Sequence, residues 1–314
     1  MKNPLIILTG PTAVGKTDLS IALAHQIGGS VISADSMQVY RHMDIGSAKI
    51  RKEEMQGIPH YLVDILEPDE EFHVVRFQEY ARQCMEEIQA EGRLPIVVGG
   101  TGFYIQALLY DIDFSQEPED RNYRSRLEQT AREQGGHVLH EMLAQVDAES
   151  AQAIHENNVK RVIRALEFYH LSGKKISEHN EEERRRKSPY QFCYFVLNDE
   201  RERLYRRIEQ RVDLMLEEGL VEEVRNLQKM GYNKHMVSMQ GLGYKEILDY
   251  LEGDCTLEEA VYRIKRDTRH FAKRQLTWFR RERQVTWIQK QEFDYDNDKI
   301  LTFMTEELKK KQII

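Results

Sequence analysis

One short segment near the N-terminus constrains the fold of this chain more than any other. Residues 10–17, GPTAVGKT, match the phosphate-loop pattern G-x-x-x-x-G-K-[ST] in full. The apolar run before it, residues 5–8, is typical of a buried parallel strand, and residues 18–27 after it carry apolar side chains at helical spacing. A phosphate loop requires this context of strand, turn and helix, so the segment predicts a site for a di- or triphosphate.

The residue types in this loop suit phosphate binding. Glycines let the backbone wrap around a phosphate, and N–H groups at the start of a helix point at the anion. Lys16 adds a positive charge for the phosphate oxygens, and the hydroxyl of Thr17 is a typical Mg²⁺ ligand. A plain glycine-rich turn is the less favoured alternative. The predicted phosphate-binding residues are Gly10, Thr12, Ala13, Val14, Gly15, Lys16 and Thr17.

Strands and helices alternate in the N-terminal part of the chain. Residues 30–33 and 93–98 predict two further short strands, and residues 73–90 between them have a helical pattern. Such alternation is typical of an α/β protein, in which helices cover the faces of a parallel sheet. We therefore predict a P-loop-containing parallel sheet flanked by helices.

The middle of the chain has a different pattern. Residues 115–125 are polar and contain proline, and a charge run at 181–187 precedes a further core strand at 191–197. Between them the apolar spacing predicts helices only, at 121–134, 137–145, 148–154 and 157–171. The predicted domains are a P-loop α/β core with basic C-terminal helices, 1–114 and 189–314, and an all-helical insertion domain, 115–188.

Composition excludes several classes of protein. No run approaches the ~18 apolar residues of a membrane span, and four consecutive apolar residues near the N-terminus are too few for a signal peptide. The three cysteines are far apart and form no C-x-x-C pair, which argues against a structural zinc site and suits a reducing compartment. We therefore expect a cytoplasmic protein without membrane association. Because nothing indicates an obligate assembly, we expect a monomer.

An acidic residue follows the second predicted strand. The carboxyl ends of neighbouring parallel strands share one crevice, so Asp35 is expected to face the same cleft as the phosphate loop. Its carboxylate suits a general base or a Mg²⁺ ligand acting through water, and an Asp that caps the next helix is the alternative. Gln38 and Tyr40 are expected at the opening of the same cleft, either as groups that recognise a ligand or as plain surface residues.

The third predicted strand ends without an acidic residue. P-loop NTPases hold Mg²⁺ with an Asp at the end of an apolar strand, whereas here the strand runs into Gly99, Gly100 and Thr101. Glycine permits a ligand to approach closely, and Thr101 offers a hydroxyl to the cleft. The missing acid argues against hydrolysis of ATP or GTP as the main activity.

The C-terminal part of the chain concentrates positive charge. Residues 261–285 contain nine Lys and Arg against two acidic residues, although the net charge of the chain is −8. Five arginines from Arg201 to Arg211 add to it, and Trp278 and Phe279 lie among the basic residues. Basic side chains neutralise phosphates and aromatic rings stack on bases, so this pattern suits RNA. The alternative is a solvated helix face with Trp278 in the core.

Seven motifs occur in order along nearly the whole chain. They are GPTAVGKT (10–17), DSMQVY (35–40), GGTGFY (99–104), NVKRVIRALE (158–167), RIEQRVDLMLEEGLVEEV (207–224), QGLGYKE (240–246) and KRQLTWFR (273–280). With these motifs the chain resembles the tRNA dimethylallyltransferase family, also called the isopentenyl-tRNA transferases. It lacks the C-terminal Cys/His zinc finger of eukaryotic members, so it resembles the bacterial type.

The resemblance implies a reaction and its substrates. A dimethylallyl group would pass from dimethylallyl diphosphate to N6 of adenosine 37 in tRNA, with Mg²⁺ as the cofactor, and the insertion domain would contact the anticodon stem-loop. Asp35 matches the family's general base, and Thr101 matches a residue that contacts the target adenine. The residues that match those holding the diphosphate and Mg²⁺ are Lys16, Thr17 and Arg211.

The resemblance also implies which residues contact tRNA. They are Asp35, Ser36, Met37, Gln38, Thr101, Tyr123, Val159, Lys160, Arg161, Val162, Ile163, Gln240, Gly241, Leu242, Gly243, Tyr244, Lys245, Lys273, Arg274, Gln275, Leu276, Thr277, Trp278, Phe279 and Arg280.

Two other functions fit parts of the sequence. A P-loop kinase of a small molecule or nucleotide can also have an Asp after the second strand, but it needs ATP as the donor and less basic helix than this chain has. A non-catalytic RNA-binding protein with a phosphate-loop switch would keep RNA binding after Asp35→Ala and have no turnover to lose. Prenyl transfer explains the phosphate loop, the missing NTPase acid and the basic helices together.

Overall fold

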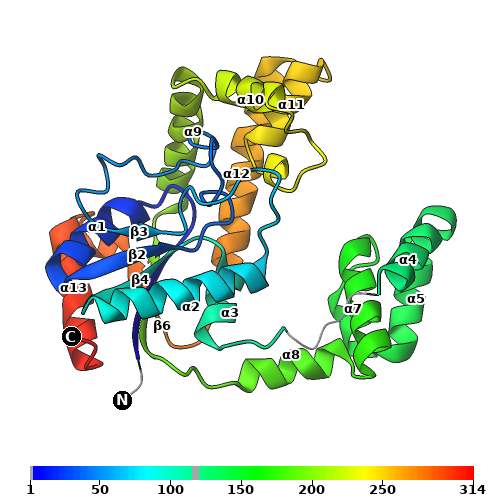
Figure 1. Ribbon diagram of the computed structural model, residues 1–314, viewed down its shortest axis with the longest axis horizontal. Helices are drawn as coiled ribbons and strands as arrows, with labels where there is room; N and C mark the ends of the chain where they lie inside the picture. Colours follow the sequence, from blue (N-terminus) through cyan, green and yellow to red (C-terminus); the bar gives the residue numbers. More distant parts are fainter. Residues whose placement is uncertain (1–2, 115–119) are drawn as a thin grey trace. The chain divides into compact units, whose positions relative to one another are not determined.

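The computed structural model describes residues 3–114 and 120–314 of the chain (Figure 1). The chain divides into two compact units. The first combines Met1–Leu109 with Pro189–Ile314, and the second is Tyr110–Ser188, so the second unit is inserted between two parts of the first. The predicted start of the insertion, residue 115, lies outside the described residues.

The first unit is built on one sheet of parallel strands. The strands are β1 (Pro4–Thr9), β2 (Gly29–Ser33), β3 (His60–Tyr61), β4 (Leu94–Gly99), β5 (Gln191–Asn198) and β6 (Val285–Gln289). Their order is β3-β2-β4-β1-β5-β6, so β1, which leads into the phosphate loop, is a central strand. The predicted fold class, α/β with a P-loop-containing parallel sheet and a helical insertion, is confirmed.

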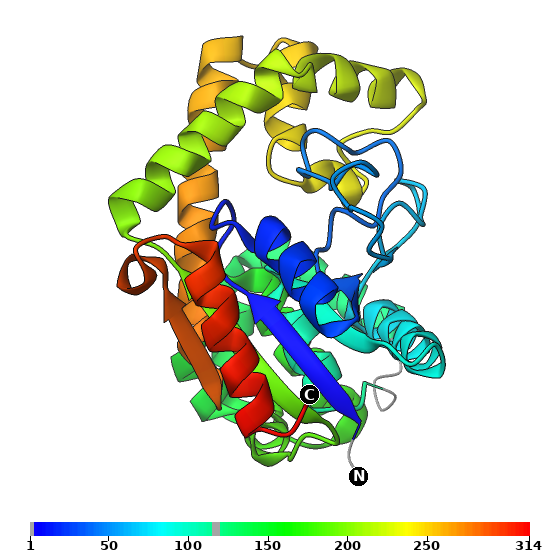
Figure 2. The same cartoon turned by 90° about the vertical axis from the view of Figure 1, so that its left-hand side faces the viewer.

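Helices cover both faces of this sheet. The helices of the first unit are α1 (Lys16–Ile27), α2 (Val74–Ala90), α3 (Gly102–Leu109), α9 (Arg201–Glu217), α10 (Leu220–Lys229), α11 (Tyr244–Glu252), α12 (Leu257–Phe279) and α13 (Asn297–Lys310), with the 3₁₀ turns η1 (Ser238–Gln240) and η2 (Lys290–Phe293). Of these, α10 and α11 pack against other helices. Strand side chains alternate between the two faces. On one face Leu8, Ile96 and Phe195 share a buried core with α1 and α13, which lie in front of the sheet in Figure 2. On the other face, α2 packs against β2 and β4.

The register of the sheet brings three segments to one edge. Thr9 pairs with Gly99, and Ser33 pairs with Val98, so β1, β2 and β4 end at nearly the same level. The segments that follow these strands therefore start side by side, at the carboxyl edge where parallel sheets bind their ligands.

The ends of β2 and β4 approach each other so closely that only glycine fits. The N–H of Ala34 donates to the carbonyl of Val98 (2.8 Å), and the N–H of Thr101 donates to the carbonyl of Ala34 (3.2 Å). A Cβ at Gly99 would lie 2.2 Å from the Ala34 oxygen. This contact fixes the segment that carries Asp35 against the segment that carries Thr101.

The second unit contains only helices among its described residues. They are α4 (Arg121–Gln134), α5 (Gly136–Val146), α6 (Ala148–Ala153), α7 (Val159–Ser172) and α8 (Ile176–Arg185). Apolar side chains of α4, α5 and α7 form its core. The buried carboxylate of Asp147 accepts hydrogen bonds from the hydroxyls of Ser150 and Ser177 (2.7 Å each), which ties α8 to the junction of α5 and α6.

Four helices or strands, β3, β6, α8 and α13, and the 3₁₀ turns η1 and η2 were not predicted from the sequence. Of these, α13 has buried residues at Ile300, Met304 and Leu308, a spacing that could have indicated it. The others lack such a signal. β3 has only two residues, too few for a pattern. β6 is partly buried along most of its length and has no clear alternation of buried and exposed residues, and α8 has no fully buried side chain among its described residues. Periodicity is a signal only where one face is buried, so these elements give none. None of the described helices has the length and apolar character of a membrane span.

Candidate active site at the phosphate loop

The phosphate loop has a backbone conformation that ordinary residues disfavour. The φ angles of Gly10, Ala13 and Gly15 are 149°, 63° and 98°. A Cβ at Gly10 would lie 2.4 Å from the carbonyl oxygen of Leu197 in β5, so a larger residue does not fit there. Left-handed residues in such a turn let successive N–H groups converge on one point, which is the geometry of an anion-binding nest.

Lys16 is the first residue of α1, and its ammonium lies against the loop. Nζ donates hydrogen bonds to the carbonyl oxygens of Gly10 (3.0 Å) and Pro11 (2.9 Å), but it forms no ion pair with any described residue. Burial and the positive charge of Arg211 lower the pKa of Lys16 to about 8, against the opposing effect of Asp35. A desolvated cation of this kind favours an anionic ligand, because a negative charge stabilises its protonated form.

Arg211 on α9 brings a second positive charge to the loop. Burial and the neighbouring Arg207 lower the pKa of Arg211, whereas Asp18 and Asp35 oppose that effect. The guanidinium forms no hydrogen bond or ion pair within the described part of the chain. The structure therefore brings two of the predicted diphosphate-binding residues together, with the effect of burial and of neighbouring cations only partly offset by Asp18 and Asp35, as suits an anion site.

Asp35 faces the same cations. Its charge raises the pKa of both Lys16 and Arg211, so the three groups form one electrostatic cluster. Oδ1 of Asp35 accepts a hydrogen bond from the N–H of Met37 (2.8 Å), which fixes the carboxylate locally. Oδ2 has no hydrogen-bond partner among the described residues and is available to a substrate.

A buried amide connects the phosphate loop to the turn that carries Thr101. Gln275 of α12 donates from Nε2 to the carbonyl of Gly100 (3.0 Å), and its Oε1 accepts from the N–H of Thr12 (2.9 Å). Two predicted site segments from the N-terminal third of the chain are thus joined by a residue of the C-terminal part whose implied role was tRNA contact.

Two further cations at the loop were missed by the sequence analysis. Nε of Arg207 donates to the carbonyl of Ala13 (2.7 Å), and Nζ of Lys290 donates to the carbonyl of Val14 (3.3 Å). Arg207 lies four residues before Arg211 on α9, a spacing that places both on one helix face and that could have indicated it. Lys290 follows the unpredicted strand β6, and no local motif marks it.

A carboxylate on α10 ties the segment between β2 and β3 to the C-terminal helices. Glu223 accepts hydrogen bonds from the N–H groups of Asp44 (2.9 Å), Ile45 (2.7 Å) and Gly46 (3.0 Å), and from the hydroxyl of Tyr244 (2.8 Å). Burial and the charge of Glu223 raise the pKa of Tyr244 well above its usual value, so the phenol remains a donor. We call these four bonds the Glu223 latch.

Replacing Glu223 by Ala is expected to open this latch. The free energy of unfolding should fall by about 2–3 kcal/mol, because several partly buried donors lose their acceptor. Amide hydrogen exchange at residues 44–46 should accelerate by about tenfold or more. The adjacent Glu222→Ala is the control: its side chain is 54% exposed in a surface pair with Arg225, so the change should stay below about 0.5 kcal/mol. Unchanged exchange at residues 44–46 in E223A would contradict the latch.

The residues with implied tRNA contacts divide into accessible and buried ones. Exposed are Lys160, Arg161, Gln240, Lys273, Arg274, Thr277 and Arg280. Partly exposed are Asp35, Ser36, Met37, Gln38, Thr101, Tyr123, Val159, Gly241, Leu242, Lys245, Leu276 and Trp278. Buried are Val162, Ile163, Gly243, Tyr244, Gln275 and Phe279. In this last group the side chains pack in the core or form internal hydrogen bonds, and Gly243 has no side chain. The implied tRNA contacts of these six residues stay predictions, and burial leaves their side chains inaccessible in this structure.

The basic stretch of α12 is also only partly available to a ligand. Lys265 and Arg269 pair with Asp213 and Glu209 of α9, at 2.5 and 2.6 Å. The exposed basic residues without an ion pair among the described residues are Lys273, Arg274, Arg280 and Arg281. The basic residues that remain candidates for RNA binding are therefore those at the C-terminal end of the stretch. Lys265 and Arg269 instead hold α12 to α9.

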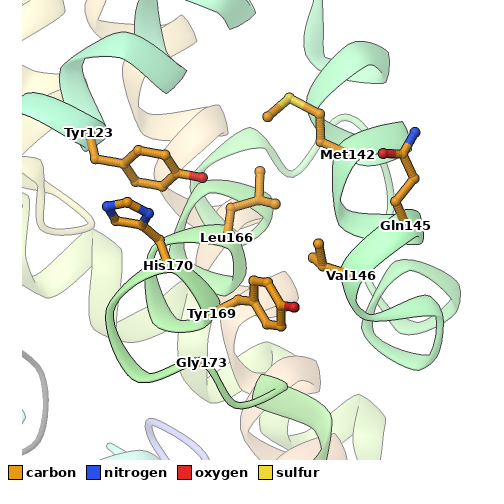
Figure 3. A pocket seen from close by; sticks show the side chains of 8 residues that line it. All are labelled: Tyr123, Met142, Gln145, Val146, Leu166, Tyr169, His170 and Gly173. Carbon is orange, nitrogen blue, oxygen red and sulfur yellow. The ribbon is translucent and has the colours of Figure 1, made fainter.

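In the second unit, Tyr123 lies at a pocket of mainly aromatic and apolar side chains (Figure 3). The ring of Tyr123 stacks on His170 at a centroid separation of 3.9 Å, and Nε2 of His170 lies 3.5 Å from the carboxylate of Asp120. The lining residues are Tyr123, Met142, Gln145, Val146, Leu166, Tyr169, His170 and Gly173. Tyr123 thus stays a candidate contact residue, with a partly exposed ring held in place.

The loop suits a metal ion that arrives with its ligand. Within the described residues, no group of three or more His, Cys, Asp or Glu side chains could hold a metal. Mg²⁺ keeps several waters and binds through substrate phosphates with one or two protein ligands, so it does not need such a group. Thr17 is exposed in the first turn of α1, beside the loop, and its hydroxyl fits this requirement.

A phosphate loop whose cations face a carboxylate defines a class: P-loop α/β proteins that act on di- or triphosphate compounds. The chain matches the family model described as IPP transferase over residues 38–282, and the model described as isopentenyl transferase over residues 3–70. It is 60% identical, over 99% of each chain, to the tRNA dimethylallyltransferase of Lachnoclostridium phytofermentans. This chain therefore belongs to the IPP transferase family.

Solved structures agree with this assignment. The full-length tRNA isopentenylpyrophosphate transferase of Bacillus halodurans superimposes with a TM-score of 0.75 at 45% identity, covering 99% of this chain and 98% of that one. A eukaryotic dimethylallyltransferase acting on tRNA gives a TM-score of 0.79 at 32% identity, covering 91% of this chain and 74% of that one. The sequence-based resemblance to this family is confirmed.

Proposed function

We propose that this chain transfers a dimethylallyl group from dimethylallyl diphosphate to N6 of adenosine 37 in tRNA, giving N6-(dimethylallyl)adenosine and diphosphate. One observation carries the proposal: Lys16, Arg211 and the carboxylate of Asp35 form a single electrostatic cluster at the phosphate loop. The cations suit a leaving diphosphate, and the carboxylate suits the proton that the amine must lose. Membership of the IPP transferase family supports this assignment.

The leaving group sets the first requirement of this reaction. When the carbon–oxygen bond of the donor breaks, both electrons stay on the diphosphate oxygen, and negative charge develops there. Donors that are already in place stabilise such charge best, because they need no reorganisation during the reaction. The N–H groups of the loop, the ammonium of Lys16 and the guanidinium of Arg211 suit this role.

The acceptor sets the second requirement. The lone pair of the adenine N6 is delocalised into the ring, so N6 must lose a proton as its bond to the allylic carbon forms. Oδ2 of Asp35 is free to accept that proton, while Oδ1 stays bound to the Met37 N–H. The adenine must leave its stack to reach this point, which costs a few kcal/mol in a duplex and less in a loop.

Mg²⁺ is the proposed cofactor, and Thr17 is its proposed protein ligand. When bound, the ion supplies further positive charge to the diphosphate oxygens. The exposed hydroxyl of Thr17 and the lack of a preformed acidic cluster among the described residues fit an ion that the diphosphate brings with it.

The proposed macromolecular partner is the anticodon stem-loop of tRNA. The exposed basic residues at the end of α12 and the exposed Lys160 and Arg161 of α7 support contacts with RNA phosphates. We further propose that the protein acts as a monomer in the cytoplasm, which suits its tRNA substrate and its three free cysteines.

The experiment that tests this function compares donors in parallel reactions with Mg²⁺ and an unmodified anticodon stem-loop. Labelled dimethylallyl diphosphate should transfer its label to the RNA, and Asp35→Ala should abolish that transfer. γ-Labelled ATP, offered with candidate small molecules and nucleotides, should transfer nothing. Phosphoryl transfer without prenyl transfer would identify a kinase instead, and RNA binding without either reaction would identify a binding protein.

The lowered pKa of Lys16 predicts how donor binding depends on pH. Above a pKa of about 8, the free protein loses the ammonium charge, whereas the bound anion favours the protonated form. The dissociation constant of an unreactive dimethylallyl diphosphate analogue should therefore rise by up to about tenfold per pH unit above that value, and stay nearly constant below it. Calorimetry from about one pH unit below to about one unit above that pKa measures this dependence. Lys16→Met should flatten the profile, and an equally steep profile in that variant would contradict the assignment to Lys16.

A further inference from the structure

Two cations contact the outer side of the phosphate loop through its peptide carbonyls. Nε of Arg207 lies 2.7 Å from the oxygen of Ala13, and Nζ of Lys290 lies 3.3 Å from the oxygen of Val14. A Cβ at Gly15 would lie 3.3 Å from Nζ of Lys290 and 3.6 Å from Nη2 of Arg207. The two cations therefore occupy one side of the loop.

These contacts determine where the N–H groups of the loop point. In a trans peptide, the carbonyl and the N–H of the next residue point in opposite directions. The carbonyl of Ala13 shares its peptide plane with the N–H of Val14, and the carbonyl of Val14 shares its plane with the N–H of Gly15. Because both carbonyls point toward the two cations, both N–H groups point to the other side of the loop.

Neither of these N–H groups forms a hydrogen bond of normal length and angle with a described residue. Val14 is fully buried, and its N–H makes only the turn contact with the carbonyl of Pro11, which falls outside those limits. Buried N–H groups are almost always paired, so two adjacent unpaired ones indicate a place for an acceptor that binds. Adjacent N–H groups beside left-handed residues form a concave site for an anion.

The conformation that exposes these donors is itself strained. Ala13 has a φ of 63°, in the left-handed region that non-glycine residues adopt only when their surroundings enforce it. Arg207 holds the carbonyl of this same residue. Lys290 is only 8% exposed, and its burial and the nearby Arg207 lower its pKa. Burying the ammonium of Lys290 costs free energy unless the ammonium forms stabilising interactions, here with the carbonyl of Val14.

We propose that Arg207 and Lys290 are positioning residues that hold two carbonyls of the phosphate loop outward, so that the N–H groups of Val14 and Gly15 are already directed at the diphosphate before it binds. The inference rests on the proposed function for the identity of the anion. Lys16 and Arg211 supply charge on the binding side of the loop, whereas Arg207 and Lys290 act through the backbone.

The test uses Lys290→Met and Arg207→Met in the full-length protein, with inorganic diphosphate and Mg²⁺ as the probe. Methionine keeps an unbranched stem of similar length and removes the charge and the donor. Calorimetry should show that each variant binds diphosphate about tenfold more weakly, because the loop donors lose their orientation. In NMR spectra of the wild type, the amide signals of Val14 and Gly15 should move on adding diphosphate. In the variants these two signals should move much less.

Kinetics and conservative variants separate positioning from a general loss of structure. The KM for dimethylallyl diphosphate should rise about tenfold while the KM for tRNA and the melting temperature stay close to those of the wild type. Lys290→Arg and Arg207→Lys should recover most of the diphosphate affinity. Arg206→Met, on the same helix as Arg207, and Lys309→Met, on α13, remove exposed charges that form no ion pair with the described residues, and they should change nothing.

Three outcomes would overturn the inference. Diphosphate affinity within about twofold of the wild type in both Met variants would show that the contacts are unimportant. A parallel loss of diphosphate affinity, tRNA affinity and stability, without rescue by the conservative variants, would show a merely structural role. Unchanged movement of the Val14 and Gly15 signals in the variants would show that these donors do not depend on the two cations. If the wild type binds diphosphate but transfers no prenyl group, the proposed function fails, while the binding data still decide this inference.

Discussion

Replacing Asp35 by Asn is expected to lower kcat for prenyl transfer about a thousandfold, the range that general base catalysis contributes. The amide has the shape of the carboxylate, and its oxygen can still accept the hydrogen bond that Oδ1 of Asp35 now accepts from the Met37 N–H. The loop should therefore keep its conformation. What the variant lacks is a group that can take the proton from N6. Single-turnover transfer of labelled dimethylallyl to an anticodon stem-loop measures this step directly.

The affinity for the donor separates this role from an electrostatic one. Because Asp35→Asn also removes a negative charge near Lys16 and Arg211, diphosphate should bind at least as tightly as before. Asp254→Asn, an exposed residue far along the chain, is the matched control and should keep full activity. A D35N enzyme that transfers within about tenfold of the wild-type rate would exclude Asp35 as the base.

The second large effect is expected at Gly99, which has no role in the chemistry. Its added Cβ in Gly99→Ala would lie 2.2 Å from the Ala34 oxygen and 2.4 Å from the Ala34 carbonyl carbon, so the backbone itself must move. Separating the ends of β2 and β4 should cost about 3 kcal/mol or more of stability. It should also lower kcat/KM about a hundredfold, since displacing a catalytic group by about 1 Å has an effect of this size. Denaturant unfolding and steady-state kinetics measure the two losses.

Gly92→Ala is the matched control for a glycine substitution. Gly92 has a φ of 72°, and nothing lies within 4 Å of a Cβ built there. It should therefore show only the cost of a left-handed alanine, about 1–2 kcal/mol, with normal kinetics. If G99A were no less stable than G92A, the close approach of the two strand ends would not be a constraint on this fold.

Local sequence patterns predicted the part of the fold that carries the phosphate loop and Asp35. β1, the phosphate loop and α1 follow from one motif with its flanking apolar residues, and Asp35 follows from the end of the next strand. These features are adjacent in sequence, and the geometry of a parallel sheet brings their ends together. The short strand β3, the edge strand β6 and the polar helix α8 could not be predicted, because none has a continuous buried face.

The residues that hold the phosphate loop in position were harder to predict than those expected to contact the substrate. Gln275 and Lys290 reach the phosphate loop from more than two hundred residues away in sequence. Their side chains bond to backbone atoms of the loop. Because every residue type has these backbone atoms, the sequence of the loop does not indicate the contacts. Phe279 and Tyr244 lie within segments implied to contact tRNA, but their side chains are buried. A motif marks a segment, and only the packing decides which side chains of it are accessible.

The position of β5 in the sheet has a consequence for how the protein is made. β1 pairs with β4 on one side and with β5 on the other, but Tyr110–Ser188 is synthesised before β5 emerges from the ribosome. If β1, β2 and β4 pair during that interval, β1, with the apolar residues Leu5, Ile6 and Ile7, is an edge strand that lacks its partner on the β5 side. Such an edge is prone to pair with other chains. In that case, chaperones that cover β1 until β5 is synthesised should raise the yield of native protein.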